Sequence, residues 1–250
     1  FVARSAQAVL RISALQIFEH QPIAGLAPLA EPIGTVAAEG EVSGPVPLTP
    51  IEHWFFEQGF AVPHHFNQAL LLAVQPGLGP EVVARALGHL LVHHDALRLR
   101  FQEGPAAVEQ VALTSAEAPF ELARTDLSAL PAAARWSAVE ATAEGLQASL
   151  DLADGPLFRA GWLDLGTGEP ARLLLAIHHL TVDVVSWHIL LEDLETACRQ
   201  LASGEPVALP RKTTSFKRWA ELLVEHARSP EVAAEAGFWL AAERLAVRPL

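Results

Sequence analysis

Residues 173–187, which read LLLAIHHLTVDVVSW, decide how the fold of this chain is interpreted. The apolar run from Leu173 to Ile177 is typical of a buried strand, and apolar residues recur at helical spacing from residue 185 to residue 201. The adjacent histidines His178 and His179 therefore lie at a strand-to-helix junction. Such a junction holds reactive side chains on rigid supports while leaving their ends open to a cleft.

The histidine pair is the candidate catalytic group. Imidazole has the unperturbed pKa closest to neutrality, so it can take and return a proton near pH 7. Successive side chains of a strand point to opposite faces, so only one of the two rings can face a given cleft. We expect His179 to be the acid/base residue and His178 to have a packing or orienting role.

Asp183 lies within a tight turn of the pair, where it could fix an imidazole tautomer or anchor an arginine; we expect a structural role. Arg98 and Arg100 alternate along a predicted strand, and one of them is a candidate partner for Asp183. Asp183 and Ser186 are favourable N-cap residues, and free N–H groups at this helix start would favour a developing oxyanion. Ser186 and Trp187 are expected to support the site.

Two other interpretations of this junction stay open. One is a structural turn in which the histidine pair is a coincidence. The other is a metal site, which is weaker because neighbouring histidines face opposite ways and Cys198 lies well along the following helix. Five further histidines and all the tryptophans are predicted to be structural, the histidines at the surface or in loops and most tryptophans in the core: His53, His64, His65, His93, His94, Trp54, Trp136, Trp162, Trp187, Trp219 and Trp239.

Composition limits the possible functions. The chain has 250 residues, 51% hydrophobic residues and a formal net charge of −12, which fits a folded acidic protein and argues against binding to nucleic acid. A single cysteine excludes an internal disulfide and is compatible with the cytoplasm. No apolar run has membrane-spanning length, so no membrane partner is expected. The absence of methionine and the start at Phe1 suggest a piece of a larger polypeptide.

Helical and strand patterns alternate along the chain, which predicts an α/β fold. Helices are predicted over residues 50–57, 80–94, 132–149, 185–201, 215–226 and 231–245, and strands over 68–74, 97–102, 108–113, 158–165 and 172–178. A turn at residues 166–168 separates the last two strands. Residues 104–119 are predicted to be loop with one short strand.

The pattern His178-His179-x-x-x-Asp183 resembles the active-site motif of the condensation-type domains of non-ribosomal peptide synthetases. Its continuation over residues 185–194 is most similar to the epimerization subgroup. Further segments resemble that subgroup or its relatives in the same order, namely PLTPIEHWFFE at 47–57, HFNQ at 65–68, HHDALRLRF at 93–101 and KTTSFKRWA at 212–220. One departure is Val184, where the family usually has Gly, which puts the local turn and the activity in doubt.

The resemblance implies a domain organisation and a fold. Residues 10–26 look like the last helices of a peptidyl carrier domain, so residues 1–30 are assigned to that domain and 31–46 to a linker. Residues 47–250 are then the first half of an epimerization or condensation-type domain. The implied fold is a two-layer α/β sandwich like chloramphenicol acetyltransferase, one half of a V-shaped pair.

The resemblance also implies a reaction, in which an aminoacyl or peptidyl thioester is converted from L to D by α-proton transfer. The substrate is carried on the 4′-phosphopantetheine of a carrier domain, and no cofactor is bound directly. His179 would be one acid/base group, and a glutamate from the other half would be the second, so the chain alone is expected to be inactive. Implied partners are the carrier domain, an upstream adenylation domain and downstream modules. The alternatives are a condensation domain that forms peptide bonds and a non-catalytic recruitment domain.

Overall fold

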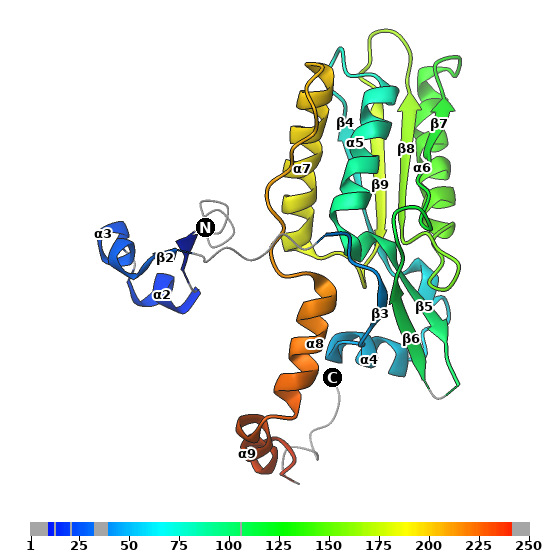
Figure 1. Ribbon diagram of the computed structural model, residues 1–250. Coiled ribbons are helices and arrows are strands. Elements are labelled where there is room, and N and C mark those ends of the chain that lie inside the picture. The colour runs from blue at the N-terminus through cyan, green and yellow to red at the C-terminus, as the bar shows by residue number, and fades with distance from the viewer. Residues whose placement is uncertain (1–9, 13, 21, 33–39, 106, 242–250) are drawn as a thin grey trace. The chain divides into compact units, whose positions relative to one another are not determined.

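The computed structural model describes residues 10–12, 14–20, 22–32, 40–105 and 107–241 (Figure 1). The chain divides into two compact units, one of residues 1–40 with 208–213 and the other of residues 41–207 with 214–250.

The first unit contains two short strands and, between them in sequence, two short helices. Strands β1 (Leu10–Arg11) and β2 (Glu31–Pro32) are antiparallel, and they enclose helices α2 (Ala14–Glu19) and α3 (Ile23–Leu26) with a 3-10 turn over Ala27–Leu29. Helices thus occupy the segment that resembles the end of a carrier domain, and the assignment itself stays a prediction. Residues 33–39 of the predicted linker lie outside the described residues.

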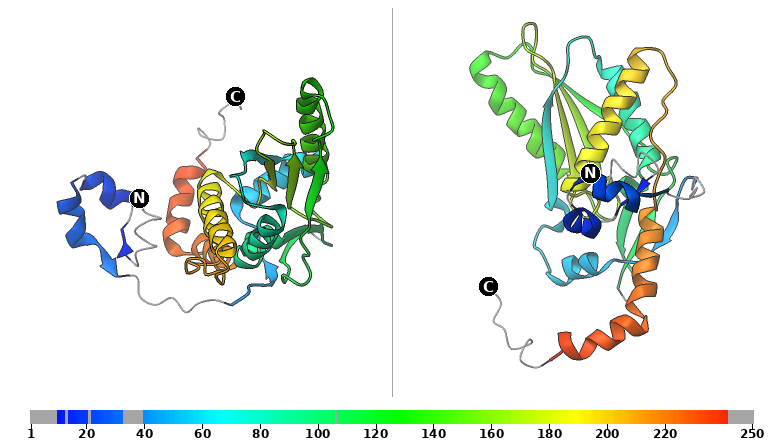
Figure 2. Two further views of the ribbon diagram at one scale, coloured as in Figure 1. Left: turned by 90° about the horizontal axis from the view of Figure 1, so that it is seen from above. Right: turned by 90° about the vertical axis from the view of Figure 1, so that its left-hand side faces the viewer.

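The second unit is built on a four-stranded sheet with the order β4-β9-β8-β7. Its strands are β4 (Asn67–Ala73), β9 (Arg172–His178), β8 (Phe158–Asp164) and β7 (Leu122–Asp126). β9 is antiparallel to both of its neighbours, and β7 runs parallel to β8. Helices α5 (Pro80–His93) and α7 (Val184–Ala202) lie along one face, and α6 (Ala132–Ala148) lies along the other (Figure 2). The predicted α/β fold class is confirmed, and α6 adds helical cover on the opposite face.

The apolar run in β9 is buried because helices cover both faces of the sheet. Residues 173–178 all have a relative exposure below 5%. Leu163 and Leu174 pack with Val139 of α6 on one face. On the same face Gly161 lets α6 approach closely, since a Cβ there would lie 2.5 Å from Cδ1 of Leu146.

A smaller antiparallel sheet lies beside α4 (Pro50–Glu57) and has the order β3-β6-β5. Its strands are β3 (Gly44–Val46), β6 (Val108–Ala112) and β5 (Leu99–Glu103). Phe55 of α4 and Ala220 of α8 (Phe216–Ala227) pack into its core. Glu52, 1% exposed, joins α4 to this sheet by accepting hydrogen bonds from Thr49 and Gln110. Desolvation by this burial raises the pKa of Glu52.

Several predictions of helices and strands are wrong. β3, which was not predicted, lies within residues 31–46 and pairs with β6, while the assignment of this segment as a linker stays a prediction. The strand predicted from residue 97 begins at Leu99, because Asp95–Arg98 form a 3-10 turn, so Arg98 and Arg100 do not alternate along one strand. β7 was not predicted. Helix α9 (Pro230–Trp239) ends earlier than predicted, and residues 242–245 lie outside the described residues.

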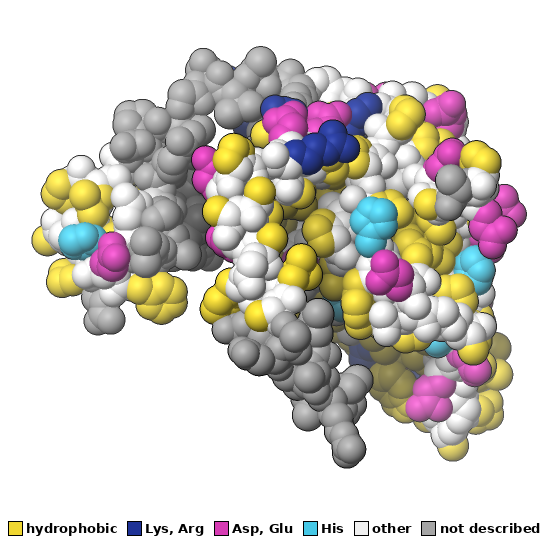
Figure 3. All heavy atoms as spheres, turned by 90° about the horizontal axis from the view of Figure 1, so that it is seen from below, with side chains coloured by type: hydrophobic (Ala, Val, Ile, Leu, Met, Phe, Trp, Pro, Cys, Tyr) yellow, Lys and Arg dark blue, Asp and Glu magenta, His cyan; other side chains and the backbone are white. Residues whose placement is uncertain are grey.

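The prediction that most tryptophans pack in the core is also wrong. All six lie in the described part of the chain, and only Trp162 and Trp187 are buried, at 8% and 7% exposure. The other four are between 48% and 61% exposed: Trp54, Trp136, Trp219 and Trp239. Hydrophobic side chains are interspersed with acidic and histidine side chains on the face seen from below (Figure 3). No helix in the described ranges combines the length and the apolar character needed to cross a membrane.

Candidate active site

The two adjacent histidines differ in burial and in hydrogen-bond partners, although both rings contact the ring of Phe66. His178, the last residue of β9, is 0% exposed and lies edge-on to Phe55 with ring centroids 5.7 Å apart. Its Nδ1 accepts a hydrogen bond from the Leu180 N–H at 3.2 Å, so Nε2 carries the proton that is donated to the Pro63 carbonyl at 2.9 Å. Burial lowers the pKa of His178 from 6.5 to about 4. His178 is therefore neutral, and its contacts are structural.

The lowered pKa of His178 predicts a loss of stability in mild acid. The unfolded chain protonates this histidine near its ordinary pKa of 6.5, whereas the folded chain does so only near pH 4. Stability from this group is thus complete above pH 6.5 and is lost as the pH falls toward 4, by up to about 3 kcal/mol. Urea unfolding at a series of pH values checks this. In His178→Gln the pH dependence over this range should be weaker, and an unchanged dependence would contradict the assignment.

His179 lies just beyond β9, is half-buried and is held by four contacts. Its backbone N–H donates to the Phe66 carbonyl at 2.8 Å, and its ring stacks on the Phe66 ring with centroids 5.2 Å apart. Its Nδ1 lies 2.8 Å from the Val182 carbonyl oxygen and its Nε2 lies 3.1 Å from Nε2 of Gln68. The ring is therefore fixed in orientation by groups that come from β4 and from its own loop.

Asp183 is the N-cap residue of α7, and Ser186 lies in the first turn. The Asp183 Oδ1 atom accepts hydrogen bonds from the Ser186 N–H at 2.7 Å and from the Ser186 hydroxyl at 2.6 Å. These bonds, the hydroxyl first, lower the pKa of Asp183. The Ser186 N–H is thus already bonded to a carboxylate and is not among the free N–H groups expected from the sequence at the start of this helix.

The expected pairing of Asp183 with Arg98 or Arg100 is not found among the described contacts. Arg98 is 0% exposed, and its guanidinium donates to backbone carbonyls, those of Leu91, Val92, Leu113 and Val42. Arg100 donates to the carbonyls of Asp154 and Leu99. Both arginines therefore hold the backbone together and leave the Asp183 carboxylate to cap α7.

Val184, which replaces the usual Gly of the motif, is accommodated without strain. It is the first residue of α7, where the helical conformation needs no positive φ, and its side chain is 66% exposed. The doubt that this residue raised about the turn is therefore removed.

The structure adds to the site one residue that sequence reasoning did not assign to it, Gln68 of β4. Gln68 is paired with Ile177 near the end of the β4–β9 ladder, and its Nε2 lies 3.1 Å from Nε2 of His179, two residues beyond Ile177. The indole N–H of Trp187 donates to Oε1 of Gln68 at 2.8 Å. The sequence feature that could have indicated Gln68 is its polar side chain directly before the apolar run of β4.

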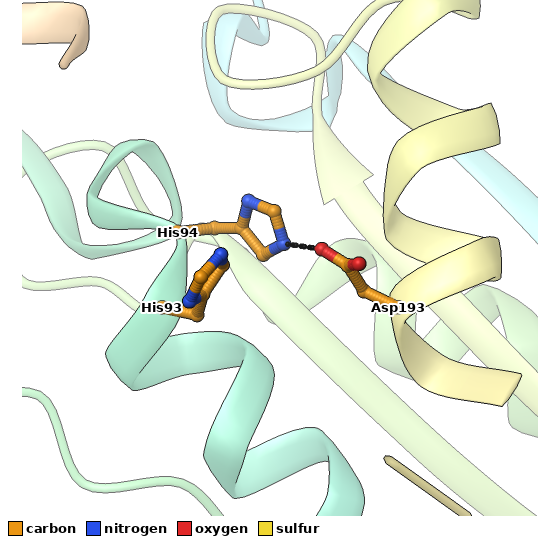
Figure 4. A group of neighbouring side chains, drawn as sticks. All are labelled: His93, His94 and Asp193. Carbon is orange, nitrogen blue, oxygen red and sulfur yellow. Dashed lines mark hydrogen bonds and ion pairs between the residues drawn. The ribbon is translucent and has the colours of Figure 1, made fainter. Parts of the chain in front are cut away.

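A second histidine pair joins α5 to α7, and Figure 4 shows it beside Asp193. Nε2 of His94 lies 2.8 Å from Oδ2 of the 5% exposed Asp193, and the His93 ring meets the His94 ring edge-on. Within the described residues, this is a group whose ligand atoms lie close enough to hold a metal, within 4.8 Å of one another. Because His94 and Asp193 are already bonded to each other, we assign the group a structural role in helix packing.

The other predicted structural histidines are close to their expected settings. His53 and His65 are exposed. His64 is half-buried, and its Nδ1 accepts the Leu152 N–H at 3.0 Å. Cys198 is buried in α7, and this burial raises the pKa of its thiol to about 11, so it is not a reactive nucleophile.

The condensation domain family matches residues 42–248, and the chain therefore belongs to this family. It is a condensation-type segment of the kind found in non-ribosomal peptide synthetases. Over 241 residues it is 48% identical to a linear gramicidin synthase subunit of Brevibacillus parabrevis, a match that covers 96% of this chain and 3% of that protein. Over 234 residues it is 42% identical to surfactin synthase subunit 1 of Bacillus subtilis (strain 168), covering 92% of this chain and 6% of that protein.

Among solved structures, the fold is similar to the epimerization domain from the third module of tyrocidine synthetase B. The TM-score is 0.76 at 34% identity, covering 84% of this chain and 47% of that one. The starter condensation domain of rhizomide synthetase RzmA has the same fold, with a TM-score of 0.67 at 20% identity over 83% of this chain and 50% of that one. This chain thus spans a small part of the synthases and about half of each structural neighbour.

Proposed function

We propose that this chain is part of an epimerization domain of a non-ribosomal peptide synthetase, with His179 as an acid/base catalyst. The substrate is an aminoacyl or peptidyl group held as a thioester on the phosphopantetheine arm of a carrier domain. Adjacent adenylation and downstream modules are the expected partners, and the cytoplasm is the expected compartment. The observation that carries the proposal is a half-buried imidazole whose Nδ1 is hydrogen-bonded to the Val182 carbonyl, which leaves the Nε2 lone pair for proton transfer.

The chemistry needs one proton to leave and one to arrive at the α-carbon. The thioester carbonyl makes the α-proton removable, and the lone pair on Nε2 of His179 takes it and leaves an enolate. Inversion then requires a proton on the opposite face, which the resemblance assigns to a glutamate in the other half of the domain. Asp183 fixes the loop that carries His179 by capping α7.

The comparisons favour epimerization over peptide-bond formation. The epimerization-domain structure is 34% identical to this chain, whereas the starter condensation domains with the same fold are 19–20% identical. The competing reaction, in which the same histidine assists an amine in attacking a donor thioester, is supported by the family match itself. A non-catalytic recruitment domain is less well supported, because such a domain would be expected to lose His179 or Asp183 and both are present, although Val184 is a feature in its favour.

The test uses the synthetase polypeptide that contains this sequence, with an L-aminoacyl-loaded carrier domain in heavy water. We expect α-deuteration of the carried amino acid and accumulation of its D-isomer, measured by mass spectrometry and chiral chromatography after release from the thioester. Formation of a peptide bond between two loaded carriers without α-deuteration would replace the proposal with condensation. Neither reaction in a folded polypeptide would favour a recruitment domain.

A further inference from the structure

The proton-transferring ring of the proposed epimerase is connected to two residues from other elements by a chain of hydrogen bonds. The indole N–H of Trp187, in α7, donates to Oε1 of Gln68, in β4, at 2.8 Å. Nε2 of Gln68 then lies 3.1 Å from Nε2 of His179, whose Nδ1 lies 2.8 Å from the Val182 carbonyl oxygen. We propose that Gln68 and Trp187 are positioning residues that set the tautomer and the direction of the His179 ring.

The three hydrogen bonds of this chain agree on where each proton lies. An indole N–H can only donate and a backbone carbonyl can only accept. Trp187 therefore requires the Gln68 carbonyl oxygen on its side, so the Gln68 amide NH₂ faces His179. The Val182 carbonyl, by accepting from Nδ1 of His179, favours a proton there, and the Gln68 NH₂ favours a lone pair on Nε2. Nε2 of His179 is then the unprotonated nitrogen, which accepts a hydrogen bond from the Gln68 amide.

Packing keeps these groups in register. Trp187 is 7% exposed, and Gln68 and His179 are half-buried. Gln68 lies opposite Ile177 in the β4–β9 ladder, and the nearby Phe66 both accepts the His179 backbone N–H and stacks on its ring. Gln68 is therefore held between Trp187 of α7 and the turn that carries His179.

This arrangement has a consequence for catalysis, which rests on the proposed epimerase function. The lone pair on Nε2 of His179 that would take the α-proton accepts a hydrogen bond from the Gln68 amide. This hydrogen bond keeps Nε2 unprotonated until the α-proton of a substrate is transferred to it. After proton transfer, the new N–H would face the amide NH₂, and the amide cannot turn its oxygen toward it without losing Trp187. Gln68 therefore favours return of the proton over its retention on the ring.

The direct test is the tautomer of His179 in the 250-residue chain, read from the ¹⁵N shifts of its ring nitrogens by NMR and assigned with His179→Asn. We expect the Nδ1–H form in the unchanged protein. Trp187→Phe keeps an aromatic ring but releases the Gln68 amide, and Gln68→Leu removes the donor. In both variants the Val182 carbonyl alone opposes the Nε2–H form, so the share of that form should rise. Gln102→Leu changes an exposed strand glutamine and should leave the tautomer unchanged.

The kinetic test uses the synthetase polypeptide. Gln68→Leu should lower kcat for α-proton exchange about 100-fold, the cost of misplacing a catalytic group, with little change in KM. An Nε2–H tautomer in the unchanged protein, or a tautomer that neither Gln68→Leu nor Trp187→Phe alters in folded variants, would overturn the proposal. Absence of proton exchange in the unchanged protein would instead remove the epimerase function and leave the tautomer result standing.

Discussion

Replacing His179 with alanine should lower α-proton exchange by about 10²- to 10⁴-fold, the usual contribution of a general acid/base group. The reason is that His179 is the member of the pair whose ring is half-buried instead of enclosed, and its Nε2 contacts only the Gln68 amide among the described hydrogen bonds. The measurement is the initial rate of deuterium incorporation into the carrier-bound aminoacyl group in heavy water.

The control for this prediction is His188→Ala. His188 lies one turn into α7, is exposed and has a ring that contacts only the Val184 carbonyl among the described hydrogen bonds, at 2.8 Å. Its removal deletes an imidazole near the site without touching the Gln68 contact, so exchange should stay within a factor of about two to three. Exchange that survives in His179→Ala but falls in His188→Ala would show that the proton transfer does not depend on His179.

The different burial of the two histidines could be anticipated from the sequence because it follows from local geometry. An apolar run predicts a buried strand, and the two-residue period of a strand sends His178 and His179 to opposite faces. The structure has His178 enclosed and His179 at the half-buried side. The N-cap role of Asp183 is equally local, since its carboxylate and the Ser186 N–H are three residues apart.

The rest of the site depends on strand pairing, which local pattern does not report. Gln68 and His179 are 111 residues apart, and only the β4–β9 register brings them together. β7 was missed because it is an edge strand of five residues, LARTD, whose polar side chains are half exposed or exposed and so carry no apolar signal. Arg98 was misassigned because a basic residue among apolar ones in this segment fits a strand as well as it fits a 3-10 turn.

Replacing Arg98 with alanine should destabilise the chain by about 4 kcal/mol, which is an unusually large effect for one substitution. The guanidinium is 0% exposed and donates to four backbone carbonyls, those of Leu91, Val92, Leu113 and Val42. Removing it leaves these acceptors without their donor and opens a space where the side chain was. The free energy of unfolding of the 250-residue chain in urea measures the effect.

Two further variants separate geometry from charge in this prediction. Arg98→Lys keeps the charge, but its single ammonium offers three donors from one point and cannot replace the planar fork that reaches four carbonyls, so we expect a loss of about 2 kcal/mol. Arg85→Ala removes an exposed arginine of α5 and should change stability by less than about 0.5 kcal/mol. If Arg98→Ala were as stable as Arg85→Ala, water would have to satisfy the last carbonyls of α5, and the Arg98 hydrogen bonds to Val42 and Leu113 would contribute nothing measurable to stability. A large loss of stability would instead show that residues 93–101 fix the end of α5. At this end of α5, Nε2 of His94 lies 2.8 Å from Oδ2 of Asp193 in α7.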